Sequence, residues 1–176
     1  MMRLLVAILF LILPYSGAYA QMLAFNIEAP AELTVTVLSD GLLDFGNLLQ
    51  NQGPVQIMLN DPGTEIISIE GDFNKDVTVT ITAPTALQLD ASNNLPFTLG
   101  AAYANDEENN KGDATLFSGN TATFPIREGG GPPPGGGRGG GPPQATAYLY
   151  IYGDITVGNV DAGTYSGTIN IFIEYD

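Results

Sequence analysis

The sequence predicts an all-β fold, an immunoglobulin-like antiparallel β-sandwich. Three observations favour this fold. Apolar and polar residues alternate over several short runs, turn-forming residues separate the runs, and no window longer than two turns has a helical period after residue 20. The chain of 176 residues is long enough for one such domain with an insertion.

The first twenty residues have the composition of a secretory signal peptide. Arg3 provides the positive start, residues 4–13 are apolar, and residues 18–20 form a small-x-small cleavage site before Gln21. The apolar stretch is too short to span a bilayer, so we expect cleavage rather than anchoring. We therefore expect an exported chain that begins at Gln21.

Alternating runs predict the strands in chain order. In the run at 77–82, Val77, Val79 and Ile81 share one face and three threonines share the other, which is typical of a half-buried strand. The same alternation recurs at 33–37, 55–59 and 97–103. Between two of these runs, residues 60–63 read Asn-Asp-Pro-Gly, which predicts a type II turn.

The run at 147–158 is apolar on both faces. Tyr148, Tyr150 and Tyr152 share one face, and Leu149 and Ile151 share the other. We therefore expect this strand to be central in its sheet. Just before it, fourteen of the fifteen residues at 129–143 are Gly or Pro, and this composition predicts a disordered loop inserted between two strands.

The run at 164–176 predicts a long final strand. Its polar face is formed by small hydroxyl residues, Asn170 and Glu174, with Phe172 as an exception. Its apolar face consists of Tyr165, Gly167, Ile169, Ile171, Ile173 and Tyr175.

The composition argues against several functions. The chain has no His and no Cys, which excludes a Ser-His-Asp triad, a cysteine nucleophile and zinc sites of the usual ligands. A glycosidase would need two carboxylates at a defined separation, which the sequence does not establish. The net charge of −14 repels nucleic acid and anionic lipid. We expect a non-enzymatic protein without a cofactor.

Two acidic segments are weak candidates for Ca²⁺ binding. Asp72, Asn74 and Asp76 have the alternate spacing that opens an EF-hand loop, but Val77 and Ala83 stand where Gly and Glu are needed. The second segment contains Asp106 and Asp113. In both segments a solvated turn or loop is the simpler interpretation.

The end of the sequence resembles subunits of bacterial chaperone–usher pili. Those subunits end in an alternating apolar strand with a penultimate aromatic residue and a Gly fourteen places from the terminus. Tyr175 and Gly163 match both features. The resemblance implies a sandwich that lacks its last strand. The gap is filled first by a periplasmic chaperone and then by the leading segment of the next subunit, and an outer-membrane usher is a further implied partner.

A second resemblance covers more of the chain. The segments LDFGNL, IEGDFNKDVTVTI and YIYGDITVGNVDAGTYSGTINIFIEYD occur in the order found in an exported bacterial family known as a domain of unknown function. That family is similar to spore-coat-U-like and pilin domains. It implies no established activity.

Residues 21–31 are the candidate donor segment, ahead of a sandwich at 32–176. Leu23, Phe25 and Ile27 alternate with smaller or polar residues, the form that strand addition requires. In this hypothesis they fill an edge formed by Tyr165, Ile169, Ile171, Ile173 and Tyr175 of another copy, and the copies build a surface filament. Two alternatives are a self-complete surface or matrix domain, with Leu23 to Ile27 paired in its own chain, and a calcium- or glycan-binding module.

Overall fold

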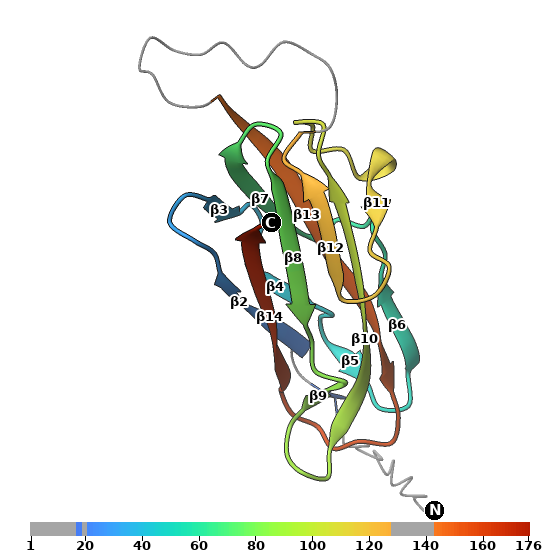
Figure 1. Ribbon diagram of the computed structural model, residues 1–176. Helices are drawn as coiled ribbons and strands as arrows, with labels where there is room; N and C mark the ends of the chain where they lie inside the picture. The colour runs from blue at the N-terminus through green and yellow to red at the C-terminus, as the bar shows by residue number, and fades with distance from the viewer. Residues whose placement is uncertain (1–16, 19–20, 128–142) are drawn as a thin grey trace, which may run out of the picture.

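The computed structural model describes residues 17–18, 21–127 and 143–176 (Figure 1). Nearly all of the signal-peptide prediction and of the predicted Gly/Pro-rich loop lies outside these residues. Residues 17 and 18 form β1 (Gly17–Ala18), which pairs with β5 (Leu48–Leu49). Within the described residues, no helix is long and apolar enough to cross a membrane.

The protein is an all-β sandwich made from one curled sheet, as the sequence predicts. Its helical content within the described residues is a single 3₁₀ turn, Lys111–Asp113. The two facing layers are joined through β9 (Ala86–Gln88) and β10 (Asn94–Ala104). The start of β10 pairs with β9 in one layer and the rest pairs with β13 (Gln144–Val157) in the other.

The first layer follows the order β3, β7, β13, β10. Its outer strands are β3 (Thr34–Val37) and β7 (Glu65–Asp72) on one side, and β10 on the other. Two shorter strands extend it: β6 (Gly53–Ile57) pairs with β13, and β11 (Thr115–Leu116) pairs with β10. β13 therefore has partners on both edges, which confirms the prediction of a central strand.

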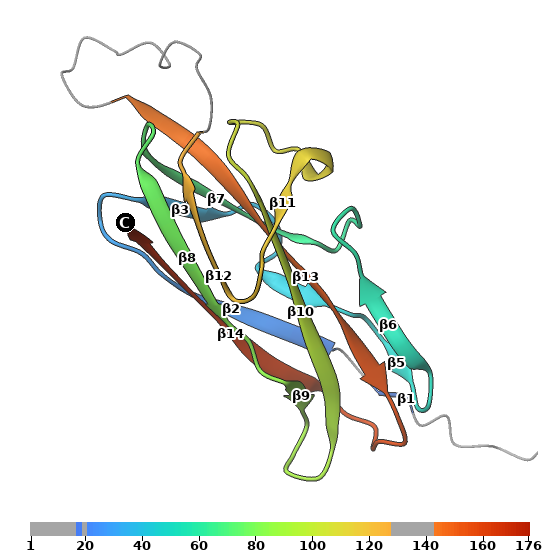
Figure 2. The ribbon, with the colours of Figure 1, turned by 45° about the vertical axis from the view of Figure 1, so that its right-hand side comes forward.

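The second layer places β14 (Tyr165–Tyr175) between two neighbours. On one side lies β8 (Asp76–Thr82), followed by β12 (Thr121–Pro125). On the other side lies β2 (Gln21–Glu28), followed by β4 (Leu42–Asp44). Figure 2 shows β2 running along β14. This pair is parallel, so the expectation of a purely antiparallel sandwich needs correction.

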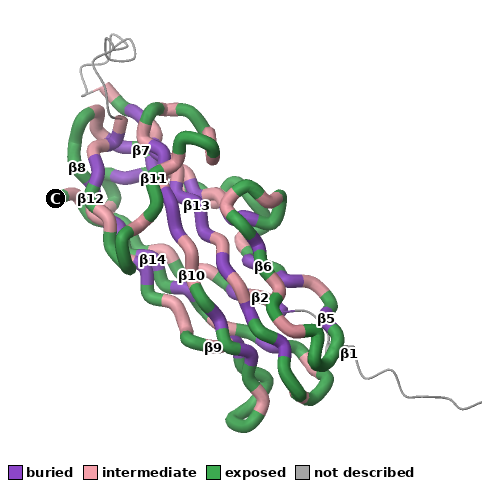
Figure 3. The backbone as a smooth tube through the Cα atoms, turned by 90° about the vertical axis from the view of Figure 1, so that its right-hand side faces the viewer, coloured by how far each residue is buried: buried purple, intermediate pink, exposed green. Residues whose placement is uncertain are grey.

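The core lies between the layers, where the apolar faces of the strands meet (Figure 3). Val77, Val79 and Ile81 are fully buried while the threonines between them are not, as the alternation predicts. Ile169, Ile171 and Ile173 of β14 are buried in the same core.

The turn at 60–63 differs in type from the prediction. The backbone N–H of Thr64 donates to the carbonyl of Asp61, so a turn is present around Pro62 and Gly63. Gly63 does not have the positive φ that a type II turn requires at this position. The Asp61 carboxylate instead accepts a hydrogen bond from the backbone N–H of Met58, which closes the loop from the other side.

Candidate functional site

The predicted donor and acceptor residues lie together, but in one chain. β2 and β14 pair in parallel over eight positions, from Gln21 opposite Tyr165 to Glu28 opposite Phe172. Leu23 is fully buried, and Phe25 and Ile27 pack half-buried against the core. In this structure β2 of the same chain lies along the edge of β14, where the hypothesis placed the leading segment of another copy.

The strand order explains why β2 fits beside β14. Immunoglobulin sandwiches have strands A, B, E and D in one layer and C, F and G in the other. In that scheme β3, β7, β13 and β10 correspond to A, B, E and D, while β8 and β14 correspond to C and F. The position of strand G beside β14 is taken by β2, which comes from the beginning of the domain and runs parallel to its neighbour.

Gly167 also belongs to this interface, although the sequence predicted it only as part of the apolar face of the strand and not as an edge residue. A Cβ at this position would lie 2.8 Å from Cδ2 of Leu23, its partner across the strands. The missing side chain therefore makes room for Leu23. A glycine inside a long apolar strand often indicates such a close approach, so a signal was present in the sequence.

Gly163 and Tyr175, the two residues of the pilin-like pattern, contact other parts of the sandwich. Gly163 precedes β14, and a Cβ there would lie 2.7 Å from two carbons of Leu89. The hydroxyl of Tyr175 accepts a hydrogen bond of 2.9 Å from the backbone N–H of Asp72 in β7. Tyr175 thus connects the two layers at the end of β14.

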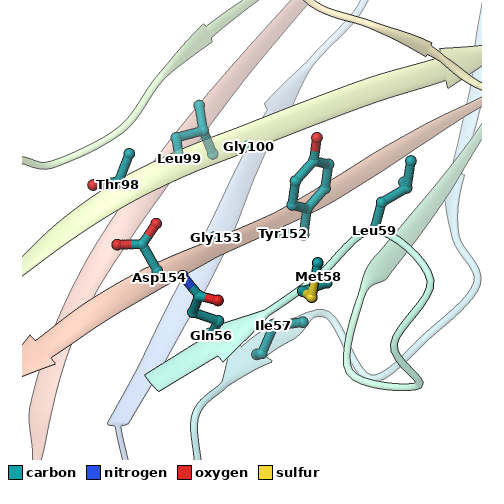
Figure 4. Close-up of a pocket in the computed structure, with 10 residues that line it drawn as sticks. All are labelled: Gln56, Ile57, Met58, Leu59, Thr98, Leu99, Gly100, Tyr152, Gly153 and Asp154. Carbon is teal, nitrogen blue, oxygen red and sulfur yellow. The ribbon is translucent and has the colours of Figure 1, made fainter. Parts of the chain in front are cut away.

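A separate cleft of about 380 Å³ lies on the outer face of the first layer (Figure 4). Tyr152 of β13 lines it, and its ring lies over Gly100 of β10. A Cβ at Gly100 would come within 2.2 Å of the ring, so only glycine lets the tyrosine lie there. Met58 and Leu59, just beyond β6, complete the apolar part of the lining.

The cleft also contains a row of polar side chains across three strands. Asp154 of β13 is opposite Gln56 of β6 on one side and Thr98 of β10 on the other, so all three share one face. Within the described part of the chain, these three side chains have no hydrogen-bond partner. Burial raises the pKa of the nearby Tyr152 above its ordinary value.

The second acidic segment covers another tyrosine on this face. The hydroxyl of Tyr150, which is fully buried, donates to Oδ1 of Asn109 at 3.0 Å. Burial and the nearby Asp106 raise the pKa of Tyr150 to about 12. Asp113 accepts from the side chain of Asn110. The segment is thus a hydrogen-bonded cover over the tyrosine.

The other calcium candidates form the turn between β7 and β8. Asn74 has a positive φ of 60°, and its backbone N–H donates to the carbonyl of Ile126. Asp72 accepts a side-chain hydrogen bond from Gln144, while Asp76 begins β8. In the described ranges, no three Asp or Glu side chains gather as a metal site would need.

Comparison with known proteins identifies a family but no activity. A family model described as a domain of unknown function, DUF4402, matches residues 21–175. The match begins at Gln21, the first residue of β2. No curated protein matches the chain.

Proposed function

The chain belongs to the DUF4402 family of domains of unknown function, and we propose that it is an exported, non-enzymatic surface or matrix domain, complete by itself, that binds a neutral saccharide. The single observation that carries the first part is the pairing of β2 with β14 in one chain. This pairing places a strand at the position of strand G without a second copy.

The cleft at Tyr152 supports the binding role. Its volume of about 380 Å³ suits one or two sugar rings. A tyrosine ring offers a flat apolar surface with a negative face, on which the C–H groups of a sugar pack. The carboxylate of Asp154 and the amide of Gln56 provide acceptors and donors for hydroxyl groups.

The negative charge of the protein favours a neutral saccharide over an anionic one. The chain has 19 acidic and 5 basic residues, and the cleft itself contains Asp154 without a basic side chain in its lining. An anionic sugar would therefore meet a repulsive potential. We infer that the ligand is neutral.

Titration with defined sugars tests this role. Cellobiose, lactose and N,N′-diacetylchitobiose serve as neutral probes, and glucuronic acid as the charged comparison. Calorimetry should detect binding of at least one neutral probe, and Tyr152→Ala should weaken it at least about tenfold, since the stacking surface is lost. Phe172→Ala, which removes an exposed aromatic ring from the other layer, is the matched control. Binding by none of the neutral probes, or equal binding by Tyr152→Ala, would reject the saccharide role.

A second candidate function is a filament built by exchange of β2 between copies. It is supported by the position of β2, because the same contacts with β14 form whether the strand comes from its own chain or from a neighbour. Only three positions pair β2 with β4 on its other edge. Head-to-tail exchange does not close, so it produces filaments, as the resemblance to pilins implies.

Mixing two single-cysteine variants distinguishes a filament built by strand exchange from a self-complete domain. Ala24 and Thr168 are paired across β2 and β14, and the native chain has no Cys. A mixture of Ala24→Cys and Thr168→Cys proteins should form a disulfide between copies only if β2 is exchanged. Absence of that crosslink, with both variants folded, would eliminate the filament.

A further inference from the structure

Gln21, at the beginning of the domain, is a polar residue in a buried position. It is fully buried, and it lies on the same face of β2 as Leu23, toward the core. Neither the nitrogen nor the oxygen of its side-chain amide has a hydrogen-bond partner among the described residues. Burying an amide without a partner is unfavourable, so a glutamine at this position requires an explanation.

Export would increase the free-energy cost of burying Gln21. Cleavage before Gln21 would create a charged α-ammonium group at this fully buried residue. A buried charge without a partner is more costly than a buried amide. The backbone here is held on both sides, because Gln21 is opposite Tyr165 and its carbonyl accepts from the N–H of Phe45 at 2.9 Å. The new terminus therefore cannot leave the core without breaking these contacts.

We propose that Gln21 is a modification site, where the new terminus cyclises to pyroglutamate. The α-amino nitrogen attacks Cδ of the side chain, a bond forms between them, the Cδ–Nε2 bond breaks, and Nε2 leaves as ammonia. No oxidant or other reactant is needed. The product is a neutral lactam, which removes both the charge and the unpaired side-chain NH₂ group while keeping one ring N–H. The reaction takes place after cleavage and before β2 packs, while the terminus is accessible.

This inference rests on the export that we propose above. Intact mass and the mass of the N-terminal peptide, measured on protein exported from the full chain, test the two ideas separately. Cyclisation predicts a chain that begins at Gln21 and is lighter than residues 21–176 by one ammonia. A chain that begins at Gln21 with a free amine and an intact amide would overturn the cyclisation and leave export standing. A chain that retains its first twenty residues would overturn export, and the cyclisation with it.

The variant Gln21→Asn tests whether cyclisation stabilises the folded protein. Gln21→Asn keeps a side-chain amide but is one carbon too short to form the five-membered lactam. We expect a free N-terminus and a lower melting temperature than that of the native protein. Met22→Leu, at the half-buried next position, is the control for a change in the same segment. A melting temperature for Gln21→Asn equal to the native one would contradict the proposal.

Discussion

At the scale of single residues, the contact between the two layers at Tyr175 depends on a glycine. Gly71 lies in β7 beside Asp72, whose N–H donates to the Tyr175 hydroxyl. A Cβ at Gly71 would lie 2.6 Å from that hydroxyl, 2.5 Å from Leu33 and 2.7 Å from Ile126. The space for Tyr175 therefore exists only because residue 71 has no side chain.

Gly71→Ala should destabilise the protein by about 1–3 kcal/mol, because overpacking forces neighbouring groups to move. Urea unfolding measures this change. Gly158→Ala is the matched control, since no atom lies within 4 Å of its Cβ position and its φ is not positive. Equal stability of the two variants would show that the layers do not pack around Gly71 as described.

The raised pKa of Tyr150 predicts a loss of stability at high pH. The folded protein holds this hydroxyl protonated up to about pH 12, whereas an unfolded tyrosine ionises near 10. The stabilisation is complete below pH 10 and is lost as the pH rises through about 12. In Tyr150→Phe the unfolding free energy should fall less steeply over this interval. An identical pH profile would contradict the burial of this hydroxyl.

At the scale of strands, local pattern and long-range pairing differ in how well they can be predicted. The faces of β13 and β14 follow from alternation along the chain, and the structure confirms them. The partner of β2 does not follow from alternation, because Leu23, Phe25 and Ile27 suit any open edge. Its parallel pairing with β14 depends on residues almost the whole length of the domain away.

The cleft could not be predicted from the sequence either, because it depends on which strands pair with one another. The alternation placed Tyr152 on a face with Tyr148 and Tyr150, but it did not indicate that Gly100 lies beneath the ring. Nor did it align Gln56, Asp154 and Thr98, which come from three strands far apart in sequence. The acidic segments were visible in the sequence, but their side chains form separate hydrogen bonds, such as that of Asp72 with Gln144 and that of Asp113 with Asn110.

The contribution of β2 to stability can be measured directly. Leu23→Ala should cost about 2–5 kcal/mol, since it removes a fully buried side chain and leaves a cavity beside Gly167. Leu116→Ala is the control, because Leu116 is 61% exposed in a short edge strand, and it should change stability by less than about 0.5 kcal/mol. A small effect at Leu23 would mean that β2 is not part of the folded core.

At the scale of the whole molecule, the protein is a sandwich in which β2, the strand at the beginning of the domain, lies beside β14. The large negative charge makes copies repel one another, and this repulsion favours pairing within one chain over exchange. Strand exchange would nevertheless create the same interface. The connectivity of β2 and β14 therefore decides between a self-complete domain and a filament subunit.

The double variant Ala24→Cys/Thr168→Cys tests this connectivity most directly. The two positions are paired, and both are exposed, so a disulfide can form between adjacent strands. After oxidation, a non-reducing gel and intact mass should show one crosslinked monomer, with the disulfide inside a single chain. A ladder of covalently linked copies would show that β2 comes from a neighbour, and would contradict the self-complete fold.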